Sequence, residues 1–244
     1  MTALVVGASS GLGRALAAEL ARNGHDLLLV ASDPRDVEAV AADLRLRHGV
    51  DARALALDLA REPDPAARVA TALEAMPRPL DALLLPIGWS SAADDGSLDA
   101  AHIGELVAIN LHAPLAIVHG LLPRLREARG VVVLFGSIAA ARGRGRNIVY
   151  AACKRALESL HESLRHAHAP GELRVHLYRL GFLATNLTWG LRLPAAPVPP
   201  QEVARVVVSR LGRGSASWYL PRRFALIAAI VRALPWPLYR RMKA

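Results

Sequence analysis

The sequence has few cysteines, aromatic residues and long apolar runs, and each shortage excludes a class of protein. Its single cysteine excludes an internal disulfide and suits a reducing compartment. Aromatic residues make up only 5% of the chain, whereas a nucleic-acid-binding surface combines them with basic stripes. No secretory signal precedes the first expected strand, and the apolar run within residues 222–232 is too short to span a bilayer. We therefore expect a cytoplasmic protein that binds no nucleic acid.

Lysine is also scarce. Only Lys154 and Lys243 are lysines among 30 basic residues, so arginine dominates the net charge of +9. Arginines spread over solvated helix faces account for that charge. The nine histidines are scattered, and His166 and His168 have neither the spacing nor the acidic neighbours of a metal site, so no metal is expected.

The length and composition suit one α/β domain. Of the 244 residues, 53% are hydrophobic, which is typical of a sheet covered by helices on both faces. No Ser/Gly/Pro-rich linker divides the chain. We expect one domain over residues 1–221, followed by an apolar and basic tail over residues 222–244. The tail either belongs to that domain or lies on a membrane surface.

A glycine-rich turn lies between the first expected strand, residues 2–6, and a helix that ends near Asn23. A strand, a glycine turn and a helix N-terminus in this order can hold a pyrophosphate with backbone N–H groups. Glycines allow the tight turn and the close approach of the phosphates. The residues expected to contact a dinucleotide here are Gly7, Ser9, Ser10, Gly11, Leu12 and Gly13.

The end of the second strand, residues 26–31, determines the choice of cofactor. An acidic residue at that point would bind the ribose 2′-hydroxyl of NAD and repel the 2′-phosphate of NADP. Ser32 stands there instead, and Arg35 and Arg14 are near enough in sequence to meet a phosphate. NADP(H) is therefore favoured, while Asp33 keeps NAD(H) open.

Two further strand ends contribute cofactor residues. Asp58 follows the strand at 52–57 and either meets the adenine edge or caps a helix that begins after Pro63. Gly88 follows the strand at 80–85 and lets the backbone pass close to a cofactor. The polar loop from Trp89 to Gly96 is expected to border the substrate.

The stretch from residue 131 to 154 carries the expected chemistry. A buried strand over residues 131–135 leads to Ser137, at the carboxyl edge of the sheet where ligands of such sheets bind. Tyr150 and Lys154 stand four apart on a following helix and so share one face. A serine, a tyrosine and a lysine that meet at this edge indicate proton transfer to a carbonyl oxygen.

Asn110 interrupts a helical pattern over residues 103–118. If buried, it must find partners or cost on the order of 1–3 kcal/mol, and an inserted side chain or water would bend the helix. Helix capping or exposure at the surface is the alternative.

These residues together resemble the classical short-chain dehydrogenase/reductase family over about the first 220 positions. Gly7, Gly11 and Gly13 match its cofactor motif, and Asn110, Ser137, Tyr150 and Lys154 follow in its catalytic order. The resemblance implies a single Rossmann-like doubly wound domain with a seven-stranded parallel sheet. It also implies homodimers or homotetramers assembled through the helices that carry Asn110 and Tyr150.

The resemblance further implies a role for each residue. Tyr150 protonates the carbonyl oxygen, and Lys154 lowers the tyrosine pKa and holds the nicotinamide ribose. Ser137 stabilises the developing alkoxide, and Asn110 places a water that links Lys154 to solvent. Thr185 contacts the nicotinamide. Two segments depart from the family pattern, namely Leu85-Pro86-Ile87-Gly88 and Leu180-Gly181.

The sequence resembles one branch of the family more than it resembles the general family pattern. The segment 146–150 and parts of the tail look like decaprenylphosphoryl-2-ketoribose reductases, which reduce a keto-sugar on a polyprenyl phosphate. We expect an NAD(P)(H)-dependent oxidoreductase that interconverts a ketone and a secondary alcohol, with a small or lipid-linked substrate. Arg142, Arg144 and Arg146 either bind a substrate phosphate or form one more solvated cluster. The alternatives are a reductase of acyl thioesters or another small carbonyl metabolite, and a non-catalytic sensor of nicotinamide cofactors.

Overall fold

Seven parallel strands form one sheet at the centre of the molecule, in the order β3-β2-β1-β4-β5-β6-β7. The structure is a computed structural model that describes residues 1–185, 188, 190 and 195–242. The strands are β1 (Thr2–Val6), β2 (Asp26–Ala31), β3 (Ala52–Ala56), β4 (Leu80–Leu85), β5 (Val131–Ser137), β6 (Arg174–Leu180) and β7 (Ala216–Leu220). The order reverses between β1 and β4, and a crevice opens at such a point beyond the carboxyl ends of the strands. The expected seven-stranded Rossmann-like fold is confirmed.

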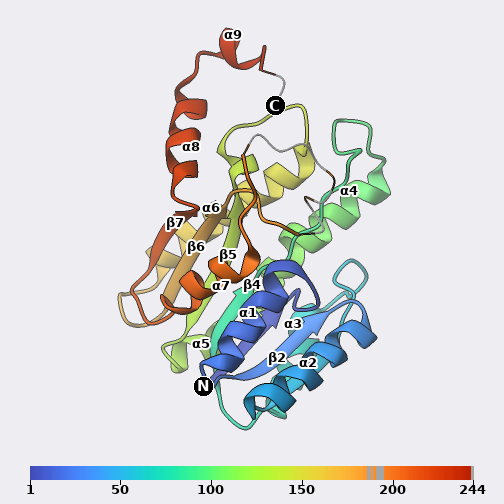
Figure 1. The fold of residues 1–244 in the computed structure, drawn as a ribbon, viewed down its shortest axis with the longest axis vertical. Helices are drawn as coiled ribbons and strands as arrows, with labels where there is room; N and C mark the ends of the chain where they lie inside the picture. The colour runs from blue at the N-terminus through green and yellow to red at the C-terminus, as the bar shows by residue number, and fades with distance from the viewer. Residues whose placement is uncertain (186–187, 189, 191–194, 243–244) are drawn as a thin grey trace.

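Helices cover both faces of this sheet (Figure 1). The strands are apolar on both sides: Ala3 and Val5 pack into one core, while Leu4 and Val6 pack into the other. This two-sided burial explains why the strands read as continuous apolar runs. The helices are α1 (Gly11–Arg22), α2 (Pro34–His48), α3 (Pro65–Glu74), α4 (Ala100–Val107), α5 (Ala113–Glu127), α6 (Ile148–Ala167), α7 (Pro200–Val208), α8 (Arg223–Ala233) and α9 (Trp236–Tyr239).

The helical segment from Ala100 to Glu127 contains a π-turn at its centre. Residues Ala108–His112 form it, and Asn110 is its buried member. The expected break in the helix at Asn110 is therefore present, although the whole segment is longer than residues 103–118. By length and composition this segment could cross a membrane. Here it packs on the sheet through the buried Ile117 and Leu121.

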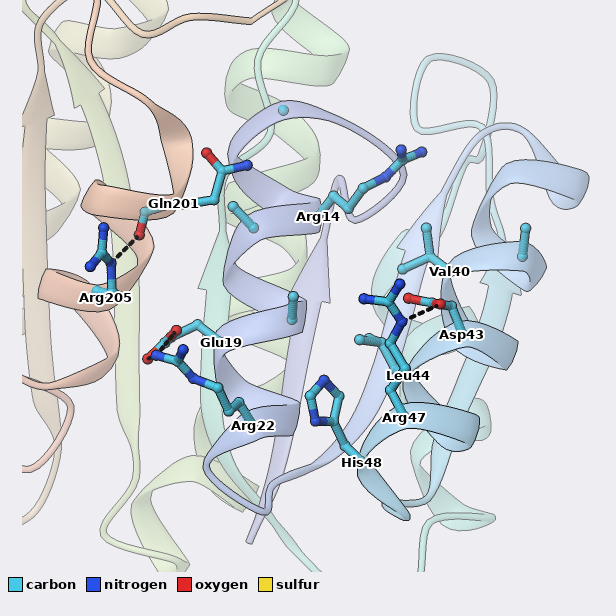
Figure 2. Close-up of a pocket in the computed structure, with 14 residues that line it drawn as sticks. Arg14, Glu19, Arg22, Val40, Asp43, Leu44, Arg47, His48, Gln201 and Arg205 are labelled. Atoms are coloured by element: carbon cyan, nitrogen blue, oxygen red, sulfur yellow. Dashed lines mark hydrogen bonds and ion pairs between the residues drawn. The ribbon is translucent and has the colours of Figure 1, made fainter.

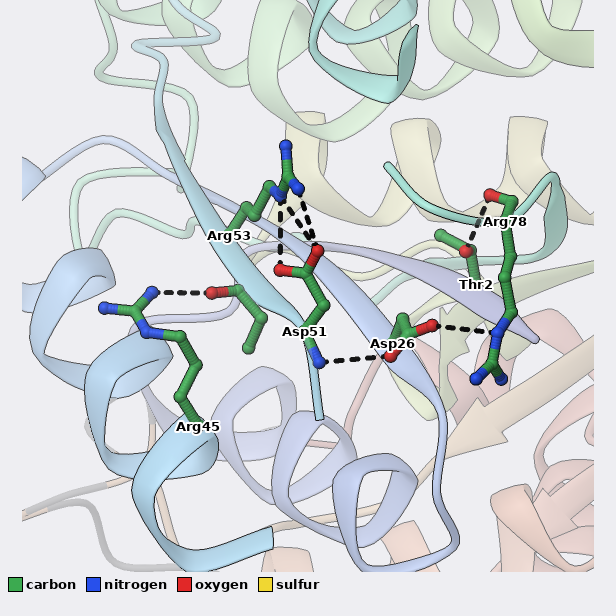
Figure 3. A network of polar contacts seen from close by, with 7 residues as sticks. Thr2, Asp26, Arg45, Asp51, Arg53 and Arg78 are labelled. Carbon is green, nitrogen blue, oxygen red and sulfur yellow. Dashed lines mark hydrogen bonds and ion pairs between the residues drawn. The ribbon is translucent and has the colours of Figure 1, made fainter. Parts of the chain in front are cut away.

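A polar network ties the amino ends of the strands together, at the opposite end from the crevice (Figure 3). The nearly buried Asp26 carboxylate accepts the Asp51 N–H at 3.1 Å and lies 3.3 Å from the Arg78 guanidinium. Thr2 donates to the Arg78 carbonyl oxygen at 2.8 Å. A buried carboxylate must be paired in this way. The network therefore stabilises the end of the sheet that is remote from the expected chemistry.

The end of β5 differs from the expected one. The strand expected over residues 131–135 extends to Ser137, because Gly136 and Ser137 still pair with β6. Helix α7 ends at Val208, and short turns continue to Arg213.

The tail forms α8 and α9, which stand beyond β7 at the end of the molecule that holds the carboxyl ends of the strands (Figure 1). Only Phe224 and Ala228 of α8 are buried. Phe224 packs against Gly181, where an added Cβ would lie 2.2 Å from its ring, and edge-on against Phe182. The tail is thus attached to the fold along one narrow stripe.

Candidate active site

A cleft of about 1700 Å³ opens at the carboxyl ends of the central strands. It brings together parts of the chain that are far apart in sequence: the glycine turn, the ends of β2 and β5, the segment after β4, helix α6 and the tail. The expected site residues that line it are Gly7, Ser9, Ser10, Gly11, Leu12, Gly13, Ser32, Asp58, Gly88, Ser137, Tyr150, Lys154 and Thr185.

The glycine turn has the shape that a dinucleotide requires. Gly7 has a φ of 93°, and a Cβ on Gly13 would lie 1.8 Å from the Gly7 carbonyl oxygen. Helix α1 begins at Gly11 with no acidic residue in its first turn, and the Ser10 side chain makes no capping bond. The first N–H groups of α1 therefore remain available for an anion, so the turn fits a pyrophosphate.

The expected cofactor residues that follow β2 do not all lie at the cleft. Ser32 lines the cleft. Asp33 caps α2, and its carboxylate accepts the N–H groups of Arg35 and Asp36 at 2.8 and 3.1 Å. Arg35 lies in the first turn of α2 and does not line this cleft within the described residues. Its contact with a cofactor stays a prediction.

Arg14 lies in a neighbouring groove of about 670 Å³ along α1, lined by α2 on one side and by Gln201 and Arg205 of α7 on the other (Figure 2). It extends from α1 towards the α2 side, and its guanidinium donates to the Ser9 carbonyl oxygen. The cation is thus held against the glycine turn. Arg22, Arg47 and His48 continue the groove away from the cleft.

Asp58 lines the cleft but caps no helix. Its carboxylate accepts the Ala60 N–H at 3.0 Å in a short turn, while Asp64 caps α3 through the Ala67 N–H at 3.0 Å. The alternative that Asp58 caps the helix is therefore wrong. The turn leaves the Asp58 side chain about half exposed at the cleft.

Ser137 and Tyr150 meet at the end of β5. The Ser137 hydroxyl oxygen accepts the Ala139 N–H at 3.1 Å, which fixes the side chain. Burial raises the pKa of Tyr150, while a hydrogen bond with Ser137 and the charge of Arg144 lower it. Burial has the largest effect, so Tyr150 is a neutral phenol at neutral pH.

Lys154 is 2% exposed and lies one helical turn from Tyr150. Its ammonium donates to the Ile87 carbonyl oxygen at 2.6 Å and lies 5.6 Å from the centroid of the Tyr150 ring. Burial lowers the pKa of Lys154 to about 8. The segment Leu85-Pro86-Ile87-Gly88, which departs from the family pattern, thus supplies a backbone acceptor for this lysine.

Asn110 is fully buried, and the structure gives its amide defined partners. The nitrogen donates to the carbonyl oxygens of Trp89 and Leu106 at 2.8 and 3.0 Å, and the oxygen accepts the Trp89 N–H at 3.2 Å. Helix capping and surface exposure are therefore wrong as explanations. These contacts fasten the chain after β4 to the π-turn, and the expected link to a water stays a prediction.

Sequence reasoning missed Asp94. Its buried carboxylate accepts the N–H groups of Val149 and Tyr150, both at 2.9 Å, and so caps α6 from a distant loop. Asn147 precedes α6 with a φ of 54° and makes no side-chain capping bond. Asn is itself a common capping residue, so the sequence carried no signal for this distant cap.

The three arginines before α6 have different surroundings. Arg142 donates to the Val231 carbonyl oxygen at 2.8 Å and also to that of Leu234, at the carboxyl end of α8. All three arginines line the cleft. The Arg142 guanidinium is taken up by the tail, whereas the other two are placed to meet a substrate.

A model of the short chain dehydrogenase family matches residues 1–195. The chain belongs to the short-chain dehydrogenase family. It is 29% identical over 215 residues to the uncharacterized oxidoreductase YmfI of Bacillus subtilis, covering 87% of this chain and 86% of that protein. It is also 25% identical over 224 residues to a very-long-chain 3-oxoacyl-CoA reductase of Laccaria bicolor, covering 90% of this chain and 66% of that one.

Among solved structures, the chain resembles a short-chain dehydrogenase from Sphingobium yanoikuyae in complex with NADPH. The two share 27% identity and a TM-score of 0.82, with 100% of this chain and 96% of the other covered. As a short-chain dehydrogenase, this protein is an oxidoreductase.

Proposed function

We propose that this short-chain dehydrogenase reduces a ketone to a secondary alcohol, or catalyses the reverse reaction, with a nicotinamide cofactor. One observation carries the proposal. A serine, a neutral tyrosine and a buried lysine reach a single cleft, and the same cleft contains a glycine turn shaped for a pyrophosphate.

Each residue then has a distinct task. When bound, the cofactor supplies the hydride that the carbonyl carbon accepts. The Tyr150 hydroxyl donates its proton to the carbonyl oxygen, and the Ser137 hydroxyl donates a hydrogen bond to the same oxygen as negative charge develops on it. The Lys154 ammonium stabilises the tyrosinate that remains, and a proton from solvent restores the phenol. The glycine turn and the start of α1 hold the pyrophosphate of the cofactor.

NADP(H) is the proposed cofactor. Ser32 stands where NAD-binding proteins of this fold carry an acidic residue, and Asp33 is occupied by capping α2. The related Sphingobium structure contains NADPH, which supports the same choice. In a titration, NADPH should bind more tightly than NADH, and Ser32→Asp should reverse that order by repelling the 2′-phosphate. Equal binding of the two by the unaltered protein would contradict the proposal.

The proposed substrate carries an anionic group, and a keto-sugar linked to a polyprenyl phosphate fits that description. Arg144 and Arg146 supply two guanidinium groups to the cleft that also holds Tyr150, and arginine matches phosphate with a two-pronged geometry. Arg146→Ala should raise KM for a phosphate-bearing ketone far more than for a small neutral ketone. Arg68→Ala is the matched control, because Arg68 is an exposed arginine that pairs with Glu62 and is not among the described residues that line the cleft.

A second candidate function is reduction of a 3-oxoacyl thioester. It is favoured by the similarity to very-long-chain 3-oxoacyl-CoA reductases and by the apolar tail residues Ile227 and Val231 at the cleft. A cofactor-sensing role without turnover gives no reason for a tyrosine, a serine and a lysine to converge.

One assay separates these candidates. Oxidation of NADPH should be followed with keto-sugars, acyl thioesters and steroids, and then repeated with Tyr150→Phe. The substitution should remove turnover while cofactor affinity stays nearly unchanged, because the hydroxyl is the proton donor. If Tyr150→Phe retained more than a few per cent of the activity, the assignment of the acid would be wrong. If no substrate were turned over while NADPH bound tightly, the sensor would be favoured.

A further inference from the structure

Helix α8 is apolar on nearly every side, yet most of it faces solvent. Its residues from Phe224 to Val231 include no polar side chain, but Leu226 is 67% exposed and Ile230 is 53% exposed. In α9, Trp236 and Leu238 are 61% and 54% exposed. A helix that is apolar all round is normally buried, and an exposed apolar patch of this kind marks an interaction site.

The exposed face is set by the way in which α8 is attached. Phe224 and Ala228 stand four residues apart and form the stripe that packs on the fold. Leu226 and Ile230 also stand four apart and so share a different face of the same helix. Arg142 fixes the carboxyl end of α8 and places its guanidinium 4.2 Å from the centroid of the Tyr239 ring. The apolar face is therefore held outward by specific contacts.

All charged side chains of the tail are basic, and Arg232 lies 3.9 Å from the buried Glu158 carboxylate. No acidic residue follows Glu202 in the sequence. Arg222, Arg240 and Arg241 form no ion pair with any residue that the structure describes. A second copy of the chain would oppose these arginines to their own equivalents across a two-fold axis, which disfavours that partner. A surface that combines apolar side chains with unneutralised arginines is complementary to anionic lipid head groups.

The same surface is continuous with the cleft. Phe224, Ile227, Val231 and Tyr239 line the cleft from the tail side, so one wall of the cleft is the inner side of α8 and α9. Figure 1 places both helices beyond the carboxyl ends of the strands, where the cleft opens. Whatever covers the outer face of α8 therefore lies next to the cleft mouth.

We propose that α8 and α9 form a docking surface for a lipid bilayer with anionic head groups, and that docking brings the cleft mouth to the bilayer. Leu226, Ile230, Trp236 and Leu238 enter the boundary between head groups and acyl chains. Arg222, Arg240 and Arg241 contact the head groups. The proposal does not depend on the reaction that the cleft performs, because it concerns binding alone.

Flotation of the full-length protein with vesicles tests this surface. The vesicles are phosphatidylcholine alone or phosphatidylcholine mixed with phosphatidylglycerol, at low salt. The protein should bind the mixed vesicles and bind phosphatidylcholine at least roughly tenfold more weakly. Replacing Arg240 and Arg241 together by Gln should weaken binding roughly 25-fold, since each basic residue near the surface contributes roughly fivefold.

The apolar contribution needs its own variant and a matched control. Leu226→Gln combined with Ile230→Gln should abolish most of the binding. Leu46→Gln should leave it unchanged, because Leu46 is a leucine that is 87% exposed on α2 and remote from the tail. Equal effects of the α8 pair and the Leu46 variant would overturn the proposal, as would failure of the unaltered protein to float with the mixed vesicles.

A second readout does not depend on the variants of α8. Trp236 is exposed, so its emission should shift to the blue when mixed vesicles are added, and Trp236→Phe should remove that shift. An unshifted spectrum would contradict insertion. Sedimentation could instead reveal that the unaltered protein is a dimer, that the variant with Leu226→Gln and Ile230→Gln is a monomer, and that neither binds vesicles. The partner would then be a second copy and the lipid proposal would be wrong.

Discussion

Helices α1 and α8 are both rich in apolar residues, but they have opposite relations to solvent. Seven of the twelve residues in α1 are buried, against two of the eleven in α8. The turn before α1 allows no side chain at Gly13, whereas much of the surface of α8 touches nothing in the described chain. Apolar sequence thus predicts a need for burial but does not identify the partner. For α1 the partner is the sheet, and for α8 we propose a bilayer.

The largest difference between the two regions should appear at Gly13. Gly13→Ala places a Cβ about where the Gly7 carbonyl oxygen lies, so the turn must open and cofactor affinity should fall by more than about 100-fold. Gly104→Ala is the control, because an added Cβ there meets nothing within 4 Å. Fluorescence titration with NADPH measures both variants. If the Gly13→Ala variant bound NADPH as tightly as the Gly104→Ala variant, the turn would not hold the cofactor.

The stripe that attaches α8 should account for an effect of similar size, on stability rather than on cofactor affinity. Phe224→Ala removes a buried ring and should cost about 3–5 kcal/mol of local stability, whereas Leu226→Ala should change stability by less than about 0.5 kcal/mol. Limited proteolysis should cleave the Phe224 variant after Pro221 while residues 1–221 stay folded. If both variants resisted protease equally, α8 would be attached by contacts other than this stripe.

The buried His161 should make the folded core sensitive to acid. His161 is 2% exposed, and burial, with the charges of Arg165 and Arg179, lowers its pKa to about 4. Between pH 6.5 and 4, His161 is therefore protonated in the unfolded chain and neutral in the folded chain. Stability should fall over this window by at most about 3 kcal/mol. His161→Leu should remove that part of the loss, as urea denaturation at pH 7 and pH 5 would measure.

The smallest expected effect concerns Lys154, whose buried ammonium contrasts with the exposed arginines of α8 and α9. If charged Lys154 is required, kcat/KM for reduction should be constant below its pKa of about 8 and fall about tenfold per pH unit above it. Lys154→Arg should move the fall to higher pH because arginine keeps its charge. A profile that stayed flat through about pH 9 would contradict this requirement.

Local patterns in the sequence predicted what depends on local geometry. Strand, glycine turn and helix fixed the expected place of Gly7 and Gly13, and helical spacing put Tyr150 and Lys154 on one face. The break in the helix at Asn110 was likewise visible from a polar residue in an apolar pattern. In the structure Gly7, Gly13, Tyr150 and Lys154 line one cleft, and Asn110 holds the Trp89 backbone beside it.

Contacts between distant segments could not be predicted in this way. Asp94 caps α6 from a loop more than 50 positions earlier, and Arg142 caps α8 from about 90 positions earlier. Nothing in the sequence spacing pairs such groups, because only the folded chain brings them together. For the same reason the sequence left Asp58 open between a helix cap and a cleft residue, and the arrangement of the turn excludes the cap.

The loop that borders the cleft is held at both ends by buried side chains. Asn110 fixes Trp89 at its start, and Asp94 fastens its far end to the backbone of Tyr150. Ser90, Ser91 and Ala92 between these anchors line the cleft and hold no part of the proton-transfer group. Evolution can therefore exchange the side chains of this short segment, and so change which molecules are admitted, while the acid and its helix keep their place. In that sense the loop is the part of the site on which selection for a new substrate can act most freely.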